Sequence, residues 1–228
     1  MEKLLIKDNI CLFTERYGFS NTYVNLYIVK DEEPALINVG PPEKVQDFLD
    51  FVDSYVPLRD IKYVFLLDSE REHVGGIPLV VSRMPGARYI TSYLNYDLII
   101  NYTSDIKLEM MREKWKMKLG KKEVRFFEAM IPTPESLFLY IDGILFTGSA
   151  FALDYKGANI DDSDRSRDIE ELFHMFRRRA HKIAEYMGKL ENFPIEIIAP
   201  AHGPVLIGRI SQYIEQWKNL SNSYKEQN

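Results

Sequence analysis

The stretch 61–76 constrains the fold of this chain more than any other part of its sequence. An apolar run from Tyr63 to Leu67 predicts a short buried strand that ends abruptly in a polar segment. That segment holds three carboxylates and one imidazole, from Asp68, Glu70, Glu72 and His73, followed by Gly75 and Gly76. Carboxylates this close repel one another unless a cation neutralises them, and oxygen and imidazole donors suit a hard or borderline metal. The stretch therefore predicts a metal site at a strand end, with a solvated acidic loop as the alternative.

The composition limits the class of protein. With 228 residues, 46% hydrophobic and 13% aromatic, the chain suits a single domain over residues 1–228 with a sizeable core. The net charge of −5 gives no general attraction to nucleic acid or to anionic membranes, so we expect neither as a partner. No stretch approaches the roughly 20 apolar residues of a membrane helix, the first residues lack the apolar core of a signal peptide, and the lone Cys11 fits a reducing compartment. We expect a cytoplasmic protein.

The first half of the chain predicts a meander of strands followed by helices and further strands. The expected strands are Leu4–Ile6, Ile10–Phe13, Thr22–Val29, Ala35–Val39, Tyr63–Leu67 and Arg88–Thr91, and the expected helices are Glu43–Val56, Ile77–Arg83 and Asn95–Tyr102. The basic segment from Arg112 to Arg125 alternates lysines with apolar residues, which predicts a half-buried strand that turns at Gly120. Its lysine face is either a solvated or interface face or, alternatively, a phosphate-binding ribbon.

The second half predicts strands over Leu137–Ile141, Ile144–Phe146 and Ile195–Ile198 and a terminal helix over Ile210–Tyr224. An apolar stripe from Ile169 to Met187 predicts one long amphipathic helix, for which Asp168 and Glu171 have the spacing of a capping box. His174 and His181 lie off this stripe, and we expect them to be partly exposed and without function. The order of elements fits an α/β (α+β) fold, a four-layered αββα sandwich with its site at the strand ends.

Four segments in order resemble one known family. The stretch 68–76 is similar to the H-x-[EH]-x-D-H-x-G-G signature of the metallo-β-lactamase superfamily, with the Glu variant of flavodiiron proteins at Glu70. Thr133-Pro-Glu-Ser-Leu137, Leu145-Phe-Thr-Gly-Ser-Ala-Phe151 and Ile198-Ala-Pro-Ala-His-Gly-Pro204 are similar to the flavodiiron segments W-P-D-S-M, L-F-S-x-D-A-F and I-A-P-S-H-G-P. The resemblance covers nearly the whole chain and implies the metallo-β-lactamase-like fold of a flavodiiron, oxygen-binding diiron core domain. A shared fold leaves the function open.

The resemblance also implies where metal ligands fall. The seven family ligands, His, Glu, Asp, His, His, bridging Asp and His, fall in this order on Asp68, Glu70, Glu72, His73, Pro132, Ser149 and His202. Pro132 has no donor side chain, and Ser149 is a poor substitute for a carboxylate that bridges two metals. The half-site with Asp68 and Glu70 therefore lacks two of its usual ligands. The other half keeps Glu72, His73 and His202, which suits one iron or zinc ion with Glu70 and Asp68 assisting. We expect at most one metal at a degenerate site.

Cofactors and partners follow from the same comparison. No Gly-rich phosphate loop follows a predicted strand and no flavodoxin-like domain follows the core, so we expect no flavin in this chain. Redox chemistry would need a separate electron donor, unless the protein senses dioxygen. The family resemblance suggests a homo-oligomer, a dimer.

Three hypotheses about function remain open. The first is a flavodiiron-like metal protein that acts on or senses dioxygen. The second is a non-catalytic, metal-free descendant used for assembly or partner binding. The third is a metal-dependent hydrolase of the wider superfamily, in which the metal would lower the pKa of a bound water that attacks an ester or phosphodiester.

Overall fold

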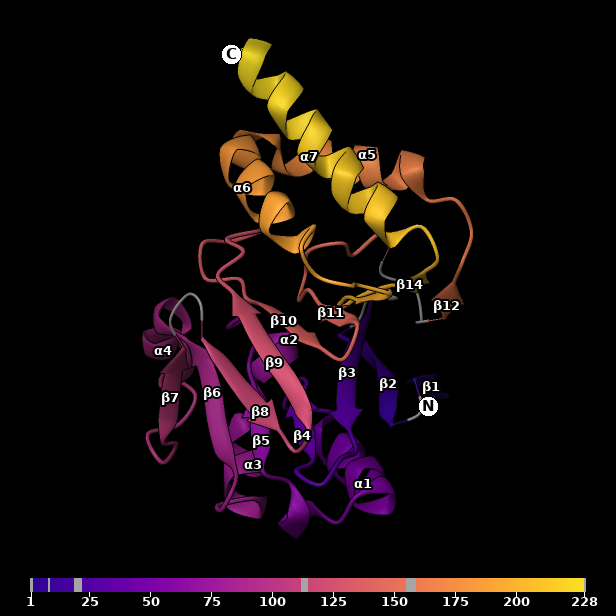
Figure 1. Ribbon diagram of the computed structural model, residues 1–228. Coiled ribbons are helices and arrows are strands. Elements are labelled where there is room, and N and C mark those ends of the chain that lie inside the picture. Colours follow the sequence, from indigo (N-terminus) through magenta and orange to yellow (C-terminus); the bar gives the residue numbers. More distant parts are fainter. Residues whose placement is uncertain (1, 8, 19–21, 112–114, 155–158, 228) are drawn as a thin grey trace.

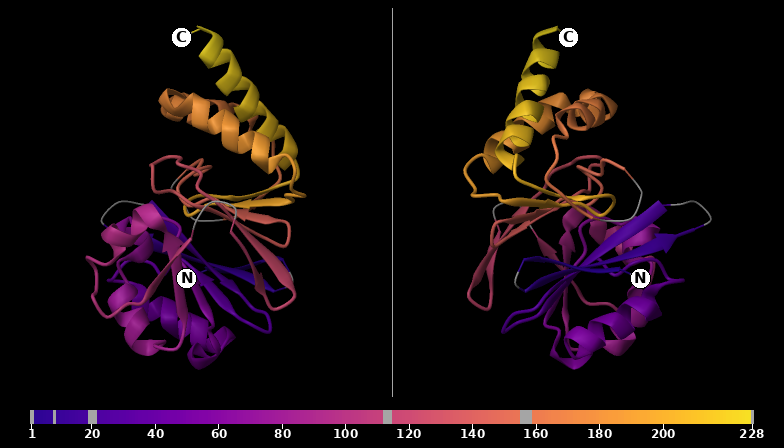
Figure 2. Two further views of the ribbon diagram at one scale, coloured as in Figure 1. Left: turned by 60° about the vertical axis from the view of Figure 1, so that its left-hand side comes forward. Right: turned by 90° about the vertical axis from the view of Figure 1, so that its right-hand side faces the viewer.

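Two β-sheets packed face to face form the centre of the molecule, and helices cover the outer face of each (Figures 1 and 2). The computed structural model describes residues 2–7, 9–18, 22–111, 115–154 and 159–227. Figure 2 shows the four layers edge-on, with the helices of the N-terminal half on one side and those of the C-terminal half on the other. The predicted αββα sandwich is confirmed.

The first sheet comprises the strands of the N-terminal half in sequence order. These are β1 (Glu2–Lys7), β2 (Ile10–Tyr17), β3 (Thr22–Val29), β4 (Ala35–Ile37), β5 (Tyr63–Phe65), β6 (Arg88–Ser92) and β7 (Leu108–Met111). The strands β1 to β4 pair antiparallel as the predicted meander, and β4 to β7 pair parallel because helices connect them. The edge strand β7 is not predicted from the sequence.

The second sheet is formed by the C-terminal half. Its strand order is β12 (Ile160–Asp161), β14 (Val205–Ile207), β13 (Ile197–Ala199), β11 (Ile144–Phe146), β10 (Phe138–Ile141), β9 (Lys122–Phe127) and β8 (Lys116–Leu119). The strands β8 and β9 form an antiparallel hairpin about Gly120, which confirms the predicted turn, while Lys114 lies outside the described residues. The strands β12 and β14 are not predicted from the sequence.

Helices fill the two outer layers. Against the first sheet lie α1 (Val45–Tyr55), the 3-10 turn η1 (Leu58–Asp60), α2 (Arg71–Val74), α3 (Ile77–Arg83) and α4 (Tyr93–Ile99). Against the second lie α5 (Ser166–Phe176), η2 (Arg177–Arg179), α6 (Ala180–Leu190) and α7 (Ile210–Gln227). Three apolar clusters result, one between the sheets and one under each helical layer. Their burial is the main force that holds the layers together.

The prediction of a single helix through Ile169–Met187 is wrong. The α-helix is interrupted between Phe176 and Ala180 by the 3-10 turn η2. Arg177 donates from Nη1 to the carbonyl of His174 at 2.9 Å, and Arg179 donates to the carbonyl of Met130 at 3.0 Å. Arginine side chains can stabilise helix C-termini by bonding their last carbonyls. The break lets α5 and α6 pack on α7 from different directions, as Figure 1 shows.

The predicted capping box of that helix is also wrong. Helix α5 begins at Ser166, whose backbone N–H donates to Asp164 at 3.0 Å, and Asp168 accepts from Arg165 at 2.9 Å. Asp168 therefore lies inside the first turn, where its charge favours the helix N-terminus, and it is not the N-cap.

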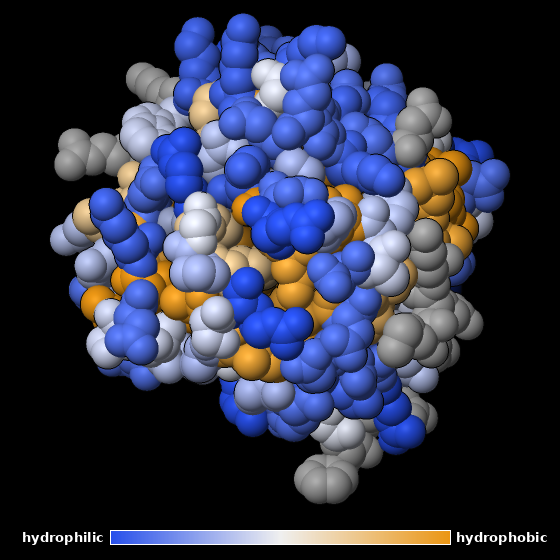
Figure 3. All heavy atoms as spheres, turned by 90° about the horizontal axis from the view of Figure 1, so that it is seen from below, coloured by the Kyte–Doolittle hydropathy of each residue, from blue (hydrophilic) through white to orange (hydrophobic). Residues whose placement is uncertain are grey.

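Hydrophilic side chains dominate the face seen from below in Figure 1, with hydrophobic atoms visible in patches between them (Figure 3). Large apolar side chains that are exposed include Tyr93, Leu94 and Leu98 on α4 and Met175 on α5. Among the described residues, no helix is both long enough and apolar enough to span a membrane.

Candidate metal centre

The start of the polar segment after β5 is held between the two sheets by hydrogen bonds to the backbone of Leu67 and its neighbours. Asn38, which follows β4, accepts from the N–H of Leu67 through Oδ1 at 3.1 Å, and its own N–H donates to Phe65 at 2.8 Å. From the other sheet, the N–H of Leu137 donates to the carbonyl of Leu67 at 2.9 Å. The residues from Asp68 onward therefore start from a fixed point at the sheet ends.

The short helix α2 fixes the backbone of His73. The carbonyl of His73 accepts from the N–H groups of Val39 at 2.8 Å and Gly40 at 2.9 Å. The N–H of Gly76 donates to the carbonyl of Gly40 at 2.9 Å, and a Cβ at Gly76 would lie 2.6 Å from Val45 Cγ2. The glycines of the sequence motif thus allow α2 and α3 to approach the segment after β4 closely.

His202 lies in the loop between β13 and β14, and strand β3 of the opposite sheet holds this loop. The side chain of Asn25 donates to the carbonyls of Pro200 at 3.0 Å and Gly203 at 2.9 Å. The hydroxyl of Tyr27 donates to the same Pro200 carbonyl at 2.5 Å. All these groups are buried, so the loop position is set by directional bonds in a low-dielectric interior.

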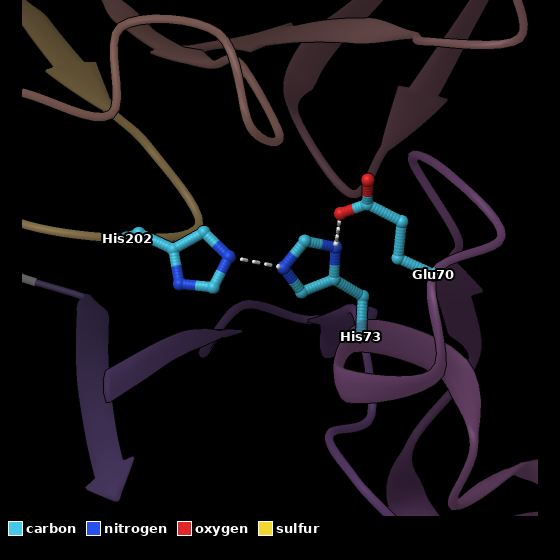
Figure 4. A group of neighbouring side chains, drawn as sticks. All are labelled: Glu70, His73 and His202. Atoms are coloured by element: carbon cyan, nitrogen blue, oxygen red, sulfur yellow. Dashed lines mark hydrogen bonds and ion pairs between the residues drawn. The ribbon is translucent and has the colours of Figure 1, made fainter. Parts of the chain in front are cut away.

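The two loops bring His73 and His202 into direct contact. Their Nε2 atoms lie 3.0 Å apart, and the rings are 0% and 2% exposed (Figure 4). Each ring is anchored at its other nitrogen. Nδ1 of His73 lies 2.7 Å from both carboxylate oxygens of Asp68, and Nδ1 of His202 lies 2.6 Å from the carbonyl oxygen of Tyr23.

These contacts, together with the opposite pKa shifts of the two rings, indicate which atoms carry protons. A carbonyl can only accept, so His202 donates from Nδ1, and its Nε2 then accepts from Nε2 of His73. His73 also donates from Nδ1 to the Asp68 carboxylate, so its ring carries protons on both nitrogens. The result is a chain of carboxylate, imidazolium, neutral imidazole and carbonyl.

The pKa shifts follow the same pattern. Burial acts to lower the pKa of His73, but the charge and hydrogen bond of Asp68, with the charges of Glu70 and Glu72, raise it above its ordinary value. Burial, together with the charge on His73, lowers the pKa of His202 to about 4. Of the two rings, His73 is therefore the one that carries the charge more readily, because the neighbouring carboxylates stabilise its charged form.

Glu70 lies beside this pair on the solvent side. Its Oε2 accepts from the Ser149 hydroxyl at 3.1 Å and lies 3.6 Å from Nδ1 of His73, and its side chain is 40% exposed. Burial, followed by the negative charge of Asp68, raises the pKa of Glu70. Glu70, His73 and His202 each place one donor atom within 4.8 Å of the others (Figure 4). At these distances one metal ion could be coordinated by all three residues.

The predicted site residues are not all placed alike. Asp68 is 4% exposed and directs both oxygens at Nδ1 of His73, so it orients an imidazole. Glu72 is consecutive with His73 on α2; in the ranges that the structure describes, it does not belong to the group of donor atoms within 4.8 Å. Ser149 reaches the site through its bond to Glu70. The Tyr23 carbonyl, which bonds His202, could not be predicted from the sequence, because every residue has a backbone carbonyl.

Comparison with known proteins identifies the family. A family model described as ODP family beta lactamase matches residues 20–203. The chain belongs to this family. This ODP-family chain is 23% identical over 229 residues to an anaerobic nitric oxide reductase flavorubredoxin of Vibrio vulnificus and 24% identical over 237 residues to one of Salmonella arizonae. It spans 46% and 47% of those two relatives, and 93% of this chain is covered in each case.

Solved structures of flavodiiron proteins share the fold of this ODP-family chain. The rubredoxin oxygen:oxidoreductase of Desulfovibrio gigas matches 97% of this chain and 62% of its own, with a TM-score of 0.84 and 18% identity. A fragment of a putative diflavin flavoprotein from Nostoc matches 99% of this chain and 97% of its own, with a TM-score of 0.85 and 19% identity. The predicted resemblance to a flavodiiron, metallo-β-lactamase-like core is confirmed.

Proposed function

We propose that this chain is a flavodiiron-like metal protein that holds one metal ion between His73 and His202 and acts on or senses dioxygen. The observation that carries the proposal is the pair of Nε2 atoms 3.0 Å apart, each on a ring anchored at Nδ1. Two imidazole nitrogens about 2.1 Å from one metal lie roughly 3.0–3.4 Å apart for angles between 90° and tetrahedral. A partner on Nδ1 is also the usual arrangement of a metal-bound histidine.

Glu70 is the carboxylate that would complete the set. It lies in the same group as the two histidines and is the most exposed of the three. Two imidazoles and one carboxylate suit non-haem iron and also zinc, with positions left open. Iron there would supply redox chemistry toward dioxygen, and zinc would supply Lewis acidity. Asp68 would hold the ring of His73, and the Ser149 hydroxyl would steady Glu70.

The donor set fits one metal better than two. At the positions where the family resemblance expects the other metal, both Asp68 oxygens lie on Nδ1 of His73, and Ser149 offers a hydroxyl that already donates to Glu70. Pro132 has no donor side chain. Since Glu70 would bind the first ion, a second ion would have no strong ligand of its own in this half of the site.

Partners are inferred from the relatives. The names of several include rubredoxin, as in flavorubredoxin and rubredoxin oxygen:oxidoreductase. We infer that this chain receives electrons from a separate donor and forms a homodimer. Analytical ultracentrifugation checks the dimer: a single monomer mass at micromolar concentration would contradict it.

A metal-free structural role is the second candidate, and one observation favours it. The hydrogen-bonded series of Asp68, His73, His202 and the Tyr23 carbonyl gives every ring nitrogen of the two histidines a partner without a metal. The negative charge of Asp68 is balanced by the protonated ring of His73, so these two buried groups together are electrically neutral.

Metal analysis separates the two candidates. Protein reconstituted anaerobically with Fe(II) and desalted should retain about one equivalent of iron, and fewer than about 0.1 equivalents of any transition metal would leave only the structural role. His73→Ala and His202→Ala should each abolish retention, whereas His181→Ala, on the exposed face of α6, should not. Equal losses from all three variants would show that the site is misplaced.

Dioxygen chemistry needs its own readout. Fe(II)-loaded protein exposed to air should change its absorption spectrum, and His202→Ala protein treated in the same way should not. Hydrolysis of generic ester or phosphodiester substrates by zinc-loaded protein, without any oxygen-dependent change, would instead support the hydrolase.

A further inference from the structure

A cavity of about 300 Å³ lies on the outer face of the second sheet, where the helical cover ends. The helices α5 to α7 pack over the centre of this sheet, and the β8–β9 hairpin extends beyond them (Figure 1). The cavity lies between this hairpin and the end of α6, and its lining includes Trp115, Arg125, Phe127, Lys189 and Phe193. It shares no residue with the candidate metal centre.

Aromatic rings form the walls of this cavity. The rings of Phe127 and Phe193 are perpendicular with centroids 5.1 Å apart, and the ring centroids of Phe193 and Tyr140 are 5.3 Å apart. Trp115 is 42% exposed at the mouth, which is a large apolar area to leave facing solvent. Rings arranged at right angles leave faces and edges against which a further aromatic ring can stack.

Positive charge surrounds the aromatic walls. Lys116 pairs in register with Arg125 and Lys118 pairs with Glu123, so all four side chains lie on the outer face of the hairpin. Lys189 lies across the cavity on α6, next to Glu185 at 2.9 Å. Four cations therefore face two carboxylates here, although the whole chain has a net charge of −5.

Arg125 is the cation best placed to bind a ligand. It donates to Glu123 from Nε at 2.7 Å. In the part of the chain that the structure describes, its two Nη atoms have no protein partner. These atoms can form the paired, charge-assisted hydrogen bonds that guanidinium groups make to carboxylates and phosphates. For the basic segment, the hypothesis of a phosphate-binding ribbon is thus replaced by a more specific one. In it, the hairpin supplies the group that binds an anion at the edge of an aromatic cavity.

We propose that this cavity binds a small planar aromatic molecule that carries one anionic group. The ring would lie among Trp115, Phe127 and Phe193, and the anionic group would bind Arg125. Small-molecule pockets begin at roughly 300 Å³ and are typically apolar with a few placed polar groups, as this one is. The proposal is independent of the metal centre.

The two tryptophans make the test specific. Trp115 lines the cavity, whereas Trp217 is fully buried and donates from its indole N–H to Ile169 at 2.8 Å. In ¹⁵N NMR spectra, titration with 2-naphthoate should shift the Trp115 indole signal saturably and leave the Trp217 signal unchanged. The variant Trp115→Phe assigns the two signals.

Charge and aromatic contact are tested separately. The neutral analogue 2-naphthamide and the variant Arg125→Met should each weaken binding about ten-fold, because each removes a charge-assisted hydrogen bond. The variant Arg167→Met removes an arginine that is likewise bonded through Nε to a glutamate, at 3.1 Å on α5, and should leave the affinity unchanged. Phe193→Ala should weaken binding of both probes.

Two outcomes would overturn the proposal. The first is the absence of a saturable Trp115 shift at millimolar 2-naphthoate. The second is equal affinity for the acid and the amide, which would show an apolar surface without anion recognition.

Discussion

The Nε2 atoms of His73 and His202 lie 3.0 Å apart although 129 positions separate the two residues. His73 extends from α2 after strand β5 of one sheet, and His202 lies between strands β13 and β14 of the other. The pair therefore forms only when the two sheets pack in their final arrangement. Its geometry depends on the packing of both sheets, since backbone hydrogen bonds hold the segment of His73 and the Asn25 side chain holds the loop of His202.

Asp68 should strengthen metal binding without being a ligand. Both of its oxygens lie 2.7 Å from Nδ1 of His73. Replacement of such a partner typically weakens metal affinity by about 10- to 100-fold, so we expect this loss for Asp68→Asn. Competition with a chromophoric chelator measures it, with Asp50→Asn on the exposed face of α1 as the matched control. Complete loss would mean that Asp68 binds the metal itself, and unchanged affinity would remove it from the site.

Metal binding should release one proton. The raised pKa of His73 means that its Nε2 proton must leave before a metal can bind there, while His202, with a pKa of about 4, is already neutral. Affinity for Zn(II) should therefore rise about ten-fold per pH unit from near pH 5 up to the raised pKa of His73, and then level off. Titration calorimetry in buffers of different ionisation enthalpy counts the proton. A pH-independent affinity across this range would contradict the assigned protonation.

A carboxylate at position 149 should make stability depend on metal. The Ser149 hydroxyl lies 3.1 Å from Glu70 Oε2, so Ser149→Asp places two acids together and should lower metal-free stability by about 1–2 kcal/mol. Bound Zn(II) would neutralise them, and the thermal shift on adding zinc should exceed that of the wild-type protein. Ser149→Ala removes the same hydrogen bond without adding charge and is the control. Equal zinc responses in the two variants would refute the expected bridging position.

The second glycine of the motif should be required for packing rather than for chemistry. A Cβ at Gly76 would lie 2.6 Å from Val45 Cγ2 and 3.1 Å from the Gly40 carbonyl, so Gly76→Ala should destabilise the protein by about 1–3 kcal/mol. Gly188 lies inside α6 with open space around it, and Gly188→Ala should stabilise by about 0.5–1 kcal/mol. Urea unfolding measures both changes. Two changes of the same sign would contradict this account.

Most elements of the fold could be predicted from local patterns. The strand β3 and the helix α3 have the bounds that the sequence predicts, because apolar periodicity and flanking turn residues act over a few positions. The edge strand β7 and the short strand β12 are not predicted, since they pair with strands that are distant in the sequence. The strand β14 pairs with β13, which directly precedes it, but its three residues are too few for a periodic pattern. The interruption of the helix after Phe176 cannot be predicted from local patterns either. One of the arginines at this point, Arg179, donates a hydrogen bond to the carbonyl of Met130, which is distant in the sequence.

The sequence by itself determined the four layers and pointed to the strand ends as the place of the candidate site, because strand and helix periods and the order of four short segments are properties of the chain. Only the tertiary structure decided what each polar residue does there. Asp68 became the partner of an imidazole, and Glu70 rather than Glu72 joined the histidines, since the ring of His73 is held by contacts from both sheets. The direction of a side chain at a strand end is set by what packs against it, and that packing comes from residues far away in the sequence.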